Sequence, residues 1–199
     1  LSSILAVFGV AILYGATGTL NMAQVAQALE KGISPAAYLG FAFFLAGFGL
    51  KAAMVPFHAW LPDAHPSAPA PISAMLSGVL IKAIGVYVLF RIFFNVVPLN
   101  AETVTIAHVL MALGAVSMVL GVFLAVGQWD FKRLLAYHSI SQMGYVVLAA
   151  GVGAEVLATG GPRSVALLAI FGSLFHMMNH ATFKSLLFLT SGAIEHATG

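Results

Sequence analysis

Two long apolar runs on either side of a proline-rich break place the strongest constraint on the fold of this chain. The segment Gly40–Arg91 contains both runs and the break, and each run carries one lysine. Several runs along the chain reach the roughly 20 apolar residues that a membrane-spanning helix needs. Hydrophobic residues make up 61% of the chain and charged residues only 7%, against about a quarter charged in soluble domains. We therefore predict an all-α, polytopic membrane helix bundle.

Turn signals divide the chain into six predicted membrane helices. Five of the eight prolines fall between Pro56 and Pro71, and a proline inside a helix removes a backbone hydrogen bond. We therefore predict a broken second helix near Pro56, beside Lys51, where protein or water must satisfy the irregular backbone. A short amphipathic stretch, Gln24–Lys31, separates the first two helices. The six predicted helices are Ile4–Met22, Ala36–Met54, Ile72–Val97, Thr103–Gly127, Leu134–Val152 and Arg163–Thr190.

Charge and cysteine content limit the partners and cofactors. The formal net charge is only +2, which gives no indication of nucleic-acid binding. The chain has no cysteine, which excludes disulfides, thiolate zinc sites and cysteine-ligated iron–sulfur clusters. Because no nucleotide, flavin, metal-cluster or quinone signature is present, we predict neither a cofactor nor a catalytic site within the chain. The chain opens at Leu1 without a methionine, and we expect an internal piece of a longer protein.

Titratable side chains within the predicted membrane helices are the candidate functional residues. Lys51 lies just before the break and Lys82 near the middle of the third helix, where a lysine is costly and indicates function. In the last helix His176, His180 and Lys184 recur every four residues, so they share one face over about 12 Å. Burial makes a lysine easier to deprotonate, and imidazole titrates near neutrality. The row therefore predicts a proton relay bridged by water.

Alternative interpretations apply to several of these residues. Lys51 also fits a snorkelling lysine that caps a helix C-terminus, whereas Lys82 lies about ten residues from either end of its helix, too deep to snorkel easily. For His180, the alternative is a satisfied hydrogen bond between helices. His138, in a polar group near the start of the fifth helix, is a further candidate that an interfacial position explains equally well.

Other polar groups are interpreted without a role in transport. A segment after the break reads as interfacial packing with an aromatic anchor, and it contains His58, Trp60 and His65. A charged turn before the fifth helix reads as a solvated loop, and it contains Asp130, Lys132 and Arg133.

A metal or haem site is the chemical alternative for the last helix. His176 and His180 have the i, i+4 spacing of zinc-binding helices, but no glutamate follows His176 and no third ligand is obvious. Lys184 would add an adverse positive charge. Haem binding would require histidines that face each other across helices at two depths, and the lysines argue against it.

Three stretches of the chain resemble the proton-translocating antiporter-like family. In order they read GLKAAMVPFHAWLPDAHPSAPAPISAMLSGVLIKAIGVY, DFKRLLAYHSISQMGYVVLA and FHMMNHATFKSLLFLTSGAI. The family comprises the large membrane subunits of respiratory complex I, their counterparts in membrane-bound hydrogenases, and the large subunits of Mrp-type sodium/proton antiporters. The similarity covers nearly the whole chain, most densely Gly40–Arg91 and Asp130–Gly192.

The resemblance implies a fold of about fourteen membrane helices with two five-helix inverted repeats, each containing one broken helix. Residues 1–98 would be the end of the first repeat and residues 99–199 the start of the second, within one membrane domain. Lys51 matches the family's lysine beside the break, and Lys82 matches its central connecting lysine. The family's polar line along the half-channel of the second repeat is matched by His176, His180 and Lys184. The glutamate partner of Lys51 and the second broken helix are expected outside this chain.

The resemblance also implies a function and a location. It implies proton translocation through buried lysine, histidine and water, within a subunit of a complex-I-like oxidoreductase, a membrane-bound hydrogenase or an Mrp-type antiporter. Other membrane subunits are the expected partners, sodium/proton exchange is the alternative to proton transport alone, and the expected location is a bacterial or archaeal cytoplasmic membrane. Two other functions stay open: a non-conducting structural anchor, and an electron-transfer subunit that carries haem or metal.

Overall fold

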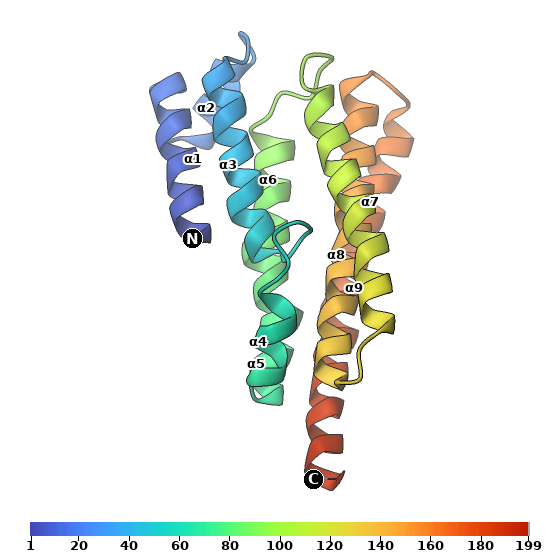
Figure 1. The fold of residues 1–199 in the computed structure, drawn as a ribbon. Helices are drawn as coiled ribbons and strands as arrows, with labels where there is room; N and C mark the ends of the chain where they lie inside the picture. Colours follow the sequence, from blue (N-terminus) through green and yellow to red (C-terminus); the bar gives the residue numbers. More distant parts are fainter. Residues whose placement is uncertain (199) are drawn as a thin grey trace.

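The computed structural model describes residues 1–198, and each regular element in that range is a helix (Figure 1). In chain order these are α1 (Ser2–Thr17), α2 (Met22–Leu29), α3 (Pro35–Lys51), α4 (Leu61–Ser67), α5 (Ala70–Met75), the π-helix η1 (Leu76–Val86), α6 (Tyr87–Asn95), α7 (Val104–Val126), α8 (Phe131–Ala158) and α9 (Arg163–Thr198). Elements α5, η1 and α6 follow one another without a break and form a single span, Ala70–Asn95.

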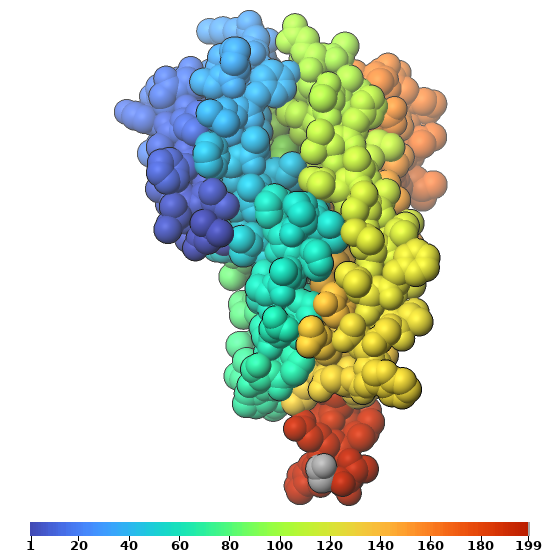
Figure 2. Space-filling view, in the orientation of Figure 1, coloured from blue at the N-terminus to red at the C-terminus, as the bar shows by residue number. Residues whose placement is uncertain are grey.

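The long helices run side by side in two groups (Figure 1). On one side α1 packs against α3, and on the other α8 packs along both α7 and α9. The span that contains η1 lies between the groups, since η1 contacts α3 and α9 as well as α8. In the space-filling view the last turns of α9 project beyond the other helices (Figure 2). The π-helical segment is therefore one of the elements that join the two halves.

Each of the six predicted membrane helices contains a helix in the structure, which confirms the polytopic all-α fold. Four helices are long and apolar enough to cross a membrane alone: Ala70–Asn95, Val104–Val126, Phe131–Ala158 and Arg163–Thr198. The first helix is shorter than predicted because Gly18 has a φ of 72° and ends α1 in the left-handed conformation. A 56° bend separates α1 from α2, so these two helices count as a fifth span only when they are taken together. The helix α3 is apolar but shorter, with 17 residues.

The predicted break near Pro56 is confirmed, and it begins immediately after Lys51. Between α3 and α4 the chain satisfies part of its backbone through side chains. The indole of Trp60 donates to the Leu50 carbonyl at 2.8 Å, and the backbone N–H of Val55 donates to the hydroxyl of Ser117 at 3.0 Å. The break is thus held by neighbouring protein, as irregular backbone inside a membrane requires.

The interpretation of the charged turn as a solvated loop is wrong for Lys132 and Arg133. The side chain of Asp130 accepts a hydrogen bond from the backbone N–H of Arg133 at 2.7 Å and caps α8. Both basic residues therefore lie in the first turn of the helix. Lys132 pairs with Glu195 at 2.8 Å and Arg133 with Asp63 at 3.5 Å, so this turn connects α8 to α9 and α4.

Candidate functional site

Lys82 lies on η1 at the junction of the two helix groups and is 4% exposed. Its ammonium group donates to the backbone carbonyl of Ser77, one π-turn earlier. Among residues 1–198, no carboxylate lies within ion-pair distance of this lysine. A buried charge normally has a paired opposite charge, and π-helical turns occur frequently at functional sites. Both observations favour a functional role for Lys82.

A pair of hydroxyl groups links this part of η1 to α8. The side chains of Ser77 and Ser139 are both buried, and their oxygens lie 3.0 Å apart. Ser139 also donates to the carbonyl of Leu135 at 3.0 Å, so Ser77 is the donor of the shared hydrogen bond. The pair places Lys82 close to the part of α8 that begins with His138.

Lys184 is fully buried on α9 and contacts α8 directly. Its nitrogen lies 3.0 Å from Nδ1 of His138, and it also sits 5.8 Å from the centre of the Phe188 ring. An ammonium group has donors only, so a charged Lys184 donates to an unprotonated Nδ1 of His138. The structure therefore joins two candidate residues from helices that are 46 positions apart in sequence.

The two histidines of α9 continue the line from Lys184. The rings of His176 and His180 are stacked with their centroids 6.5 Å apart, and Nε2 of His176 lies 2.7 Å from Oε1 of Gln142 on α8. His180 is fully buried, and neither of its ring nitrogens has a hydrogen-bonding partner within residues 1–198. The alternative of a satisfied hydrogen bond between helices is therefore wrong for His180.

The candidate residues of η1, α8 and α9 form one group in space. Lys82, Lys184, His138 and His176 all lie within electrostatic range of His180. In the described part of the chain, no three histidine, aspartate or glutamate side chains are placed to hold a metal ion. The group therefore combines lysine and histidine side chains from three elements.

Lys51 stands apart from this group. It is half-buried at the C-terminal end of α3, and no hydrogen bond or ion pair within residues 1–198 joins it to the other candidates. The backbone nonetheless brings it close to η1, because a side-chain carbon at Gly85 would lie 2.6 Å from the backbone nitrogen of Ala52. The residue after Lys51 therefore touches the helix that carries Lys82.

Sequence reasoning missed two members of the group and the burial of a third residue beside it. Gln142 follows His138 by four residues, so helical spacing alone places them on one face. Ser77 is brought to α8 only by the fold. The interfacial interpretation of His65 is wrong, because this residue is fully buried and its ring stacks on Phe188 with centroids 4.3 Å apart.

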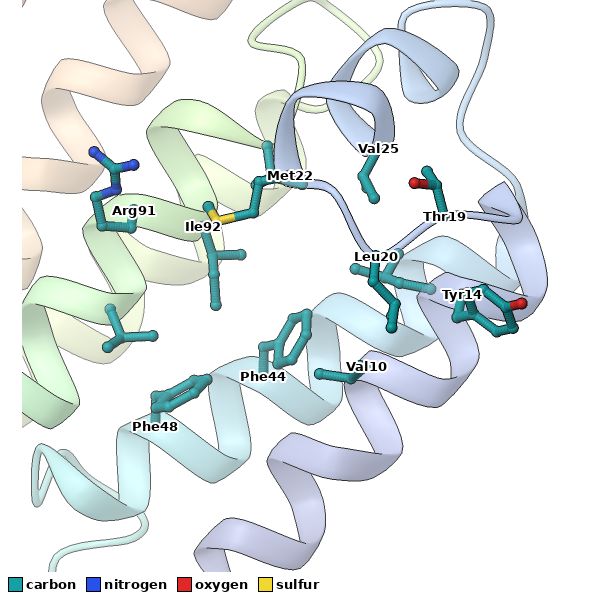
Figure 3. Close-up of a pocket in the computed structure, with 13 residues that line it drawn as sticks. Val10, Tyr14, Thr19, Leu20, Met22, Val25, Phe44, Phe48, Arg91 and Ile92 are labelled. Carbon is teal, nitrogen blue, oxygen red and sulfur yellow. The ribbon is translucent and has the colours of Figure 1, made fainter.

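A separate apolar cavity of about 380 Å³ lies among α1, α2, α3 and α6. Figure 3 shows Phe44 and Phe48 of α3 on one side and Met22 of α2 on another, and Arg91 of α6 is the one charged side chain of the lining. None of the candidate residues reaches this cavity. It is therefore distinct from the row of titratable groups.

Comparison with known proteins finds a family match over the entire chain. The family model described as "NADH:quinone oxidoreductase/Mrp antiporter, TM" matches residues 1–199. The chain is 40% identical to hydrogenase-4 component B of Escherichia coli over 89% of its own length and 26% of that protein. It is 37% identical to NADH-quinone oxidoreductase subunit N of Desulforudis audaxviator, over 96% of its length and 36% of that protein.

A solved structure shares the fold. The structure of the Mrp complex from Dietzia sp. contains a chain that matches 98% of this one with a TM-score of 0.81 and 32% identity. The matched part is 33% of that chain. This chain therefore spans about a quarter to just over a third of the relatives that it matches.

Proposed function

Because the chain belongs to the NADH:quinone oxidoreductase/Mrp antiporter family, we propose that it carries protons across a membrane through its buried lysines and histidines. The group formed by Lys82, Lys184, His138, His180 and His176 would hold the proton at successive positions. Water molecules would bridge the remaining gaps. The full protein would act as one subunit of a larger membrane complex, in the cytoplasmic membrane of a bacterium or archaeon.

The observation that carries this proposal is the continuity of the row. Lys82 connects through Ser77 and its hydroxyl partner to α8, and α8 supplies His138 to Lys184. The row then follows α9 from Lys184 to His180. Each step joins residues of different elements or successive turns of one helix. A structural role for any one residue would not require this continuity.

Electrostatic coupling between the lysines supplies the means of moving a proton along the row. Two positive charges about 8 Å apart repel by about 2 kcal/mol at an effective dielectric constant of about 20. Lys82 and Lys184 lie within electrostatic range of each other. Protonation of one therefore disfavours protonation of the other, and a proton arriving at Lys82 would drive a proton from Lys184 onward.

Lys51 would control the entry of the proton to Lys82. When Lys51 lies near a carboxylate its charge is compensated, and when it moves away its charge acts on Lys82. That carboxylate would come from the remainder of the full protein, as would the second broken helix. In this proposal residues 1–98 end one inverted repeat, residues 99–199 begin the other, and η1 transfers the proton between them.

The driving energy would come from other subunits. The relatives' names include an NADH-quinone oxidoreductase and a hydrogenase, and the family description adds the Mrp antiporters. In the first two classes a redox reaction would drive the protons. In the third, sodium ions would exchange against them.

Proton transport by the assembled complex in sealed vesicles tests the proposal. We expect transport to collapse in the Lys51→Ala and Lys82→Ala variants while the complex remains assembled. Normal transport in both variants would refute the mechanism. The His180→Ala, Lys184→Ala double variant separates this function from that of a structural anchor, because an anchor predicts intact assembly with normal transport.

A further inference from the structure

His65 is a buried titratable group that the proposed row does not use. It lies on α4, directly after the break, and is fully buried. Neither ring nitrogen has a hydrogen-bonding partner among the residues that the structure describes. Buried side-chain nitrogens almost always have partners, so an unpartnered imidazole at this depth calls for an explanation other than packing.

The position of the His65 ring is fixed by its neighbours. The hydroxyl of Ser73 on α5 donates to the backbone carbonyl of His65 at 3.2 Å. The ring itself stacks on Phe188 of α9 at 4.3 Å, and the same phenyl ring receives the ammonium group of Lys184 at 5.8 Å. His65 and Lys184 thus contact one aromatic ring.

The positive charges of both buried lysines act on the ring of His65. Lys184 and Lys82 lie within electrostatic range of its ring, although the three residues belong to α9, η1 and α4. A phenylalanine or leucine would fill the same space against Phe188 at no cost in polar burial. The imidazole adds a group that can take up or release a proton beside the two lysines.

One end of α4 is charged and exposed. Asp63, two residues before His65, pairs with Arg133 at 3.5 Å and is 74% exposed. The ammonium group of Lys132 lies 3.4 Å from the carbonyl of Ala68, three residues after His65, and also pairs with the exposed Glu195. Charged side chains of α8 therefore contact the chain on both sides of His65, while its ring contacts the phenyl ring that Lys184 also contacts.

We infer that His65 is a proton-carrying residue that connects the charged end of α4 and α8 with Lys184 and Lys82. This inference rests on the proposed transport function. The imidazole would accept a proton from water at the charged end and release it toward the lysines, through water or by rotation of its ring. Its two unpartnered nitrogens suit this role, because one accepts a proton while the other releases one.

Two substitutions at this position separate proton transfer from packing. His65→Gln keeps a polar side chain that binds water but cannot take up an extra proton, and His65→Phe keeps an aromatic ring against Phe188. We expect both variants of the full complex to assemble and to lose at least ten-fold in the initial rate of proton transport into sealed vesicles. The matched control is His108→Gln, since His108 is exposed and pairs with Glu155 at the far end of α7 and α8; it should keep the wild-type rate.

The outcomes distinguish this inference from the function on which it rests. A wild-type rate in His65→Gln, with transport abolished in Lys82→Ala, would overturn the role of His65 and leave the proposed function standing. Wild-type rates in both would overturn both. Failure of both His65 variants to assemble would assign this residue to the structure and would also overturn the inference. The N–H proton of the His65 imidazole should exchange quickly with deuterium. Infrared spectroscopy of the wild-type complex, isotope-labelled at histidine, monitors this exchange in D₂O. A ring that stays unexchanged would contradict the relay.

Discussion

The close approach of Gly85 to Ala52 gives a prediction whose magnitude follows from the geometry. A side-chain carbon at residue 85 would lie 2.6 Å from the backbone nitrogen of Ala52 and 2.7 Å from its Cα, whereas ordinary contacts begin at 3.4 Å. Gly85→Ala must therefore separate η1 from the broken segment by about 0.8 Å, because backbone atoms cannot turn aside. Overpacking of this kind costs about 1–3 kcal/mol.

A second glycine provides the control. Gly172 on α9 has no atom within 4 Å of the position that a side-chain carbon would occupy. Replacing a helical glycine by alanine stabilises a helix by about 0.5–1 kcal/mol, and this gain is common to both variants. The difference between Gly85→Ala and Gly172→Ala therefore isolates the close approach, at about 1–3 kcal/mol.

Detergent-induced unfolding of the purified complex measures this difference. We expect the Gly85→Ala variant to unfold at a lower detergent concentration than the wild type. The Gly172→Ala variant should unfold at an equal or higher detergent concentration. Because Gly85 lies three residues after Lys82 on η1, proton transport should fall in the first variant and stay normal in the second. Equal stability of both variants would refute the packing of the break against η1.

Three further predictions follow from single contacts. Lys184→Met should reduce proton transport at least ten-fold in sealed vesicles at normal assembly, whereas His108→Gln should leave it unchanged; equal rates would contradict the role of Lys184. Trp60→Phe should lower stability by about 0.5–1.5 kcal/mol, which an unfolding titration detects. The carbonyl of Leu50 loses the indole donor, although the backbone N–H of Ala53 still donates to it. Ser77→Ala should cost about 0.5–1.5 kcal/mol and lower proton transport several-fold, because the row loses the hydroxyl that links η1 to Ser139 of α8; a wild-type rate would contradict the connection through this hydroxyl.

Most of the fold was predictable because apolar length and helix-breaking residues decide membrane helices. Helix ends were less predictable. We predicted that the last helix ends at Thr190, but α9 continues to Thr198. Gly192 does not end it, and Ala70 of α5 packs closely against this glycine. A glycine that permits close packing and one that ends a helix look alike in sequence.

The candidate site was predictable where it depends on one helix. The four-residue spacing placed His176, His180 and Lys184 on one face, and the structure keeps them in one row. The link from η1 to α8 was not predictable, because Ser77 and Ser139 are 62 residues apart and meet only through packing of η1 on α8. Pairing between distant segments leaves no local pattern in a single sequence.

The π-helical form of the central span was also beyond sequence reasoning. We predicted a continuous α-helix over Ile72–Val97, but residues Leu76–Val86 form η1. Its apolar composition fits either helix type, and η1 packs against α3, α8 and α9. His65 was misread for a similar reason, since a histidine among prolines after a break is typical of an interface, and only the fold places it beneath α9.

Proton transport in the Lys82→Met variant tests the central claim most directly. Methionine fills nearly the same volume in the apolar surroundings of η1 without a titratable group, so the complex should assemble normally. Initial rates of proton transport should be measured in sealed vesicles with equal amounts of assembled complex. The proposed row predicts a loss of at least ten-fold, because protons could no longer pass between the two halves; a wild-type rate at normal assembly would contradict it.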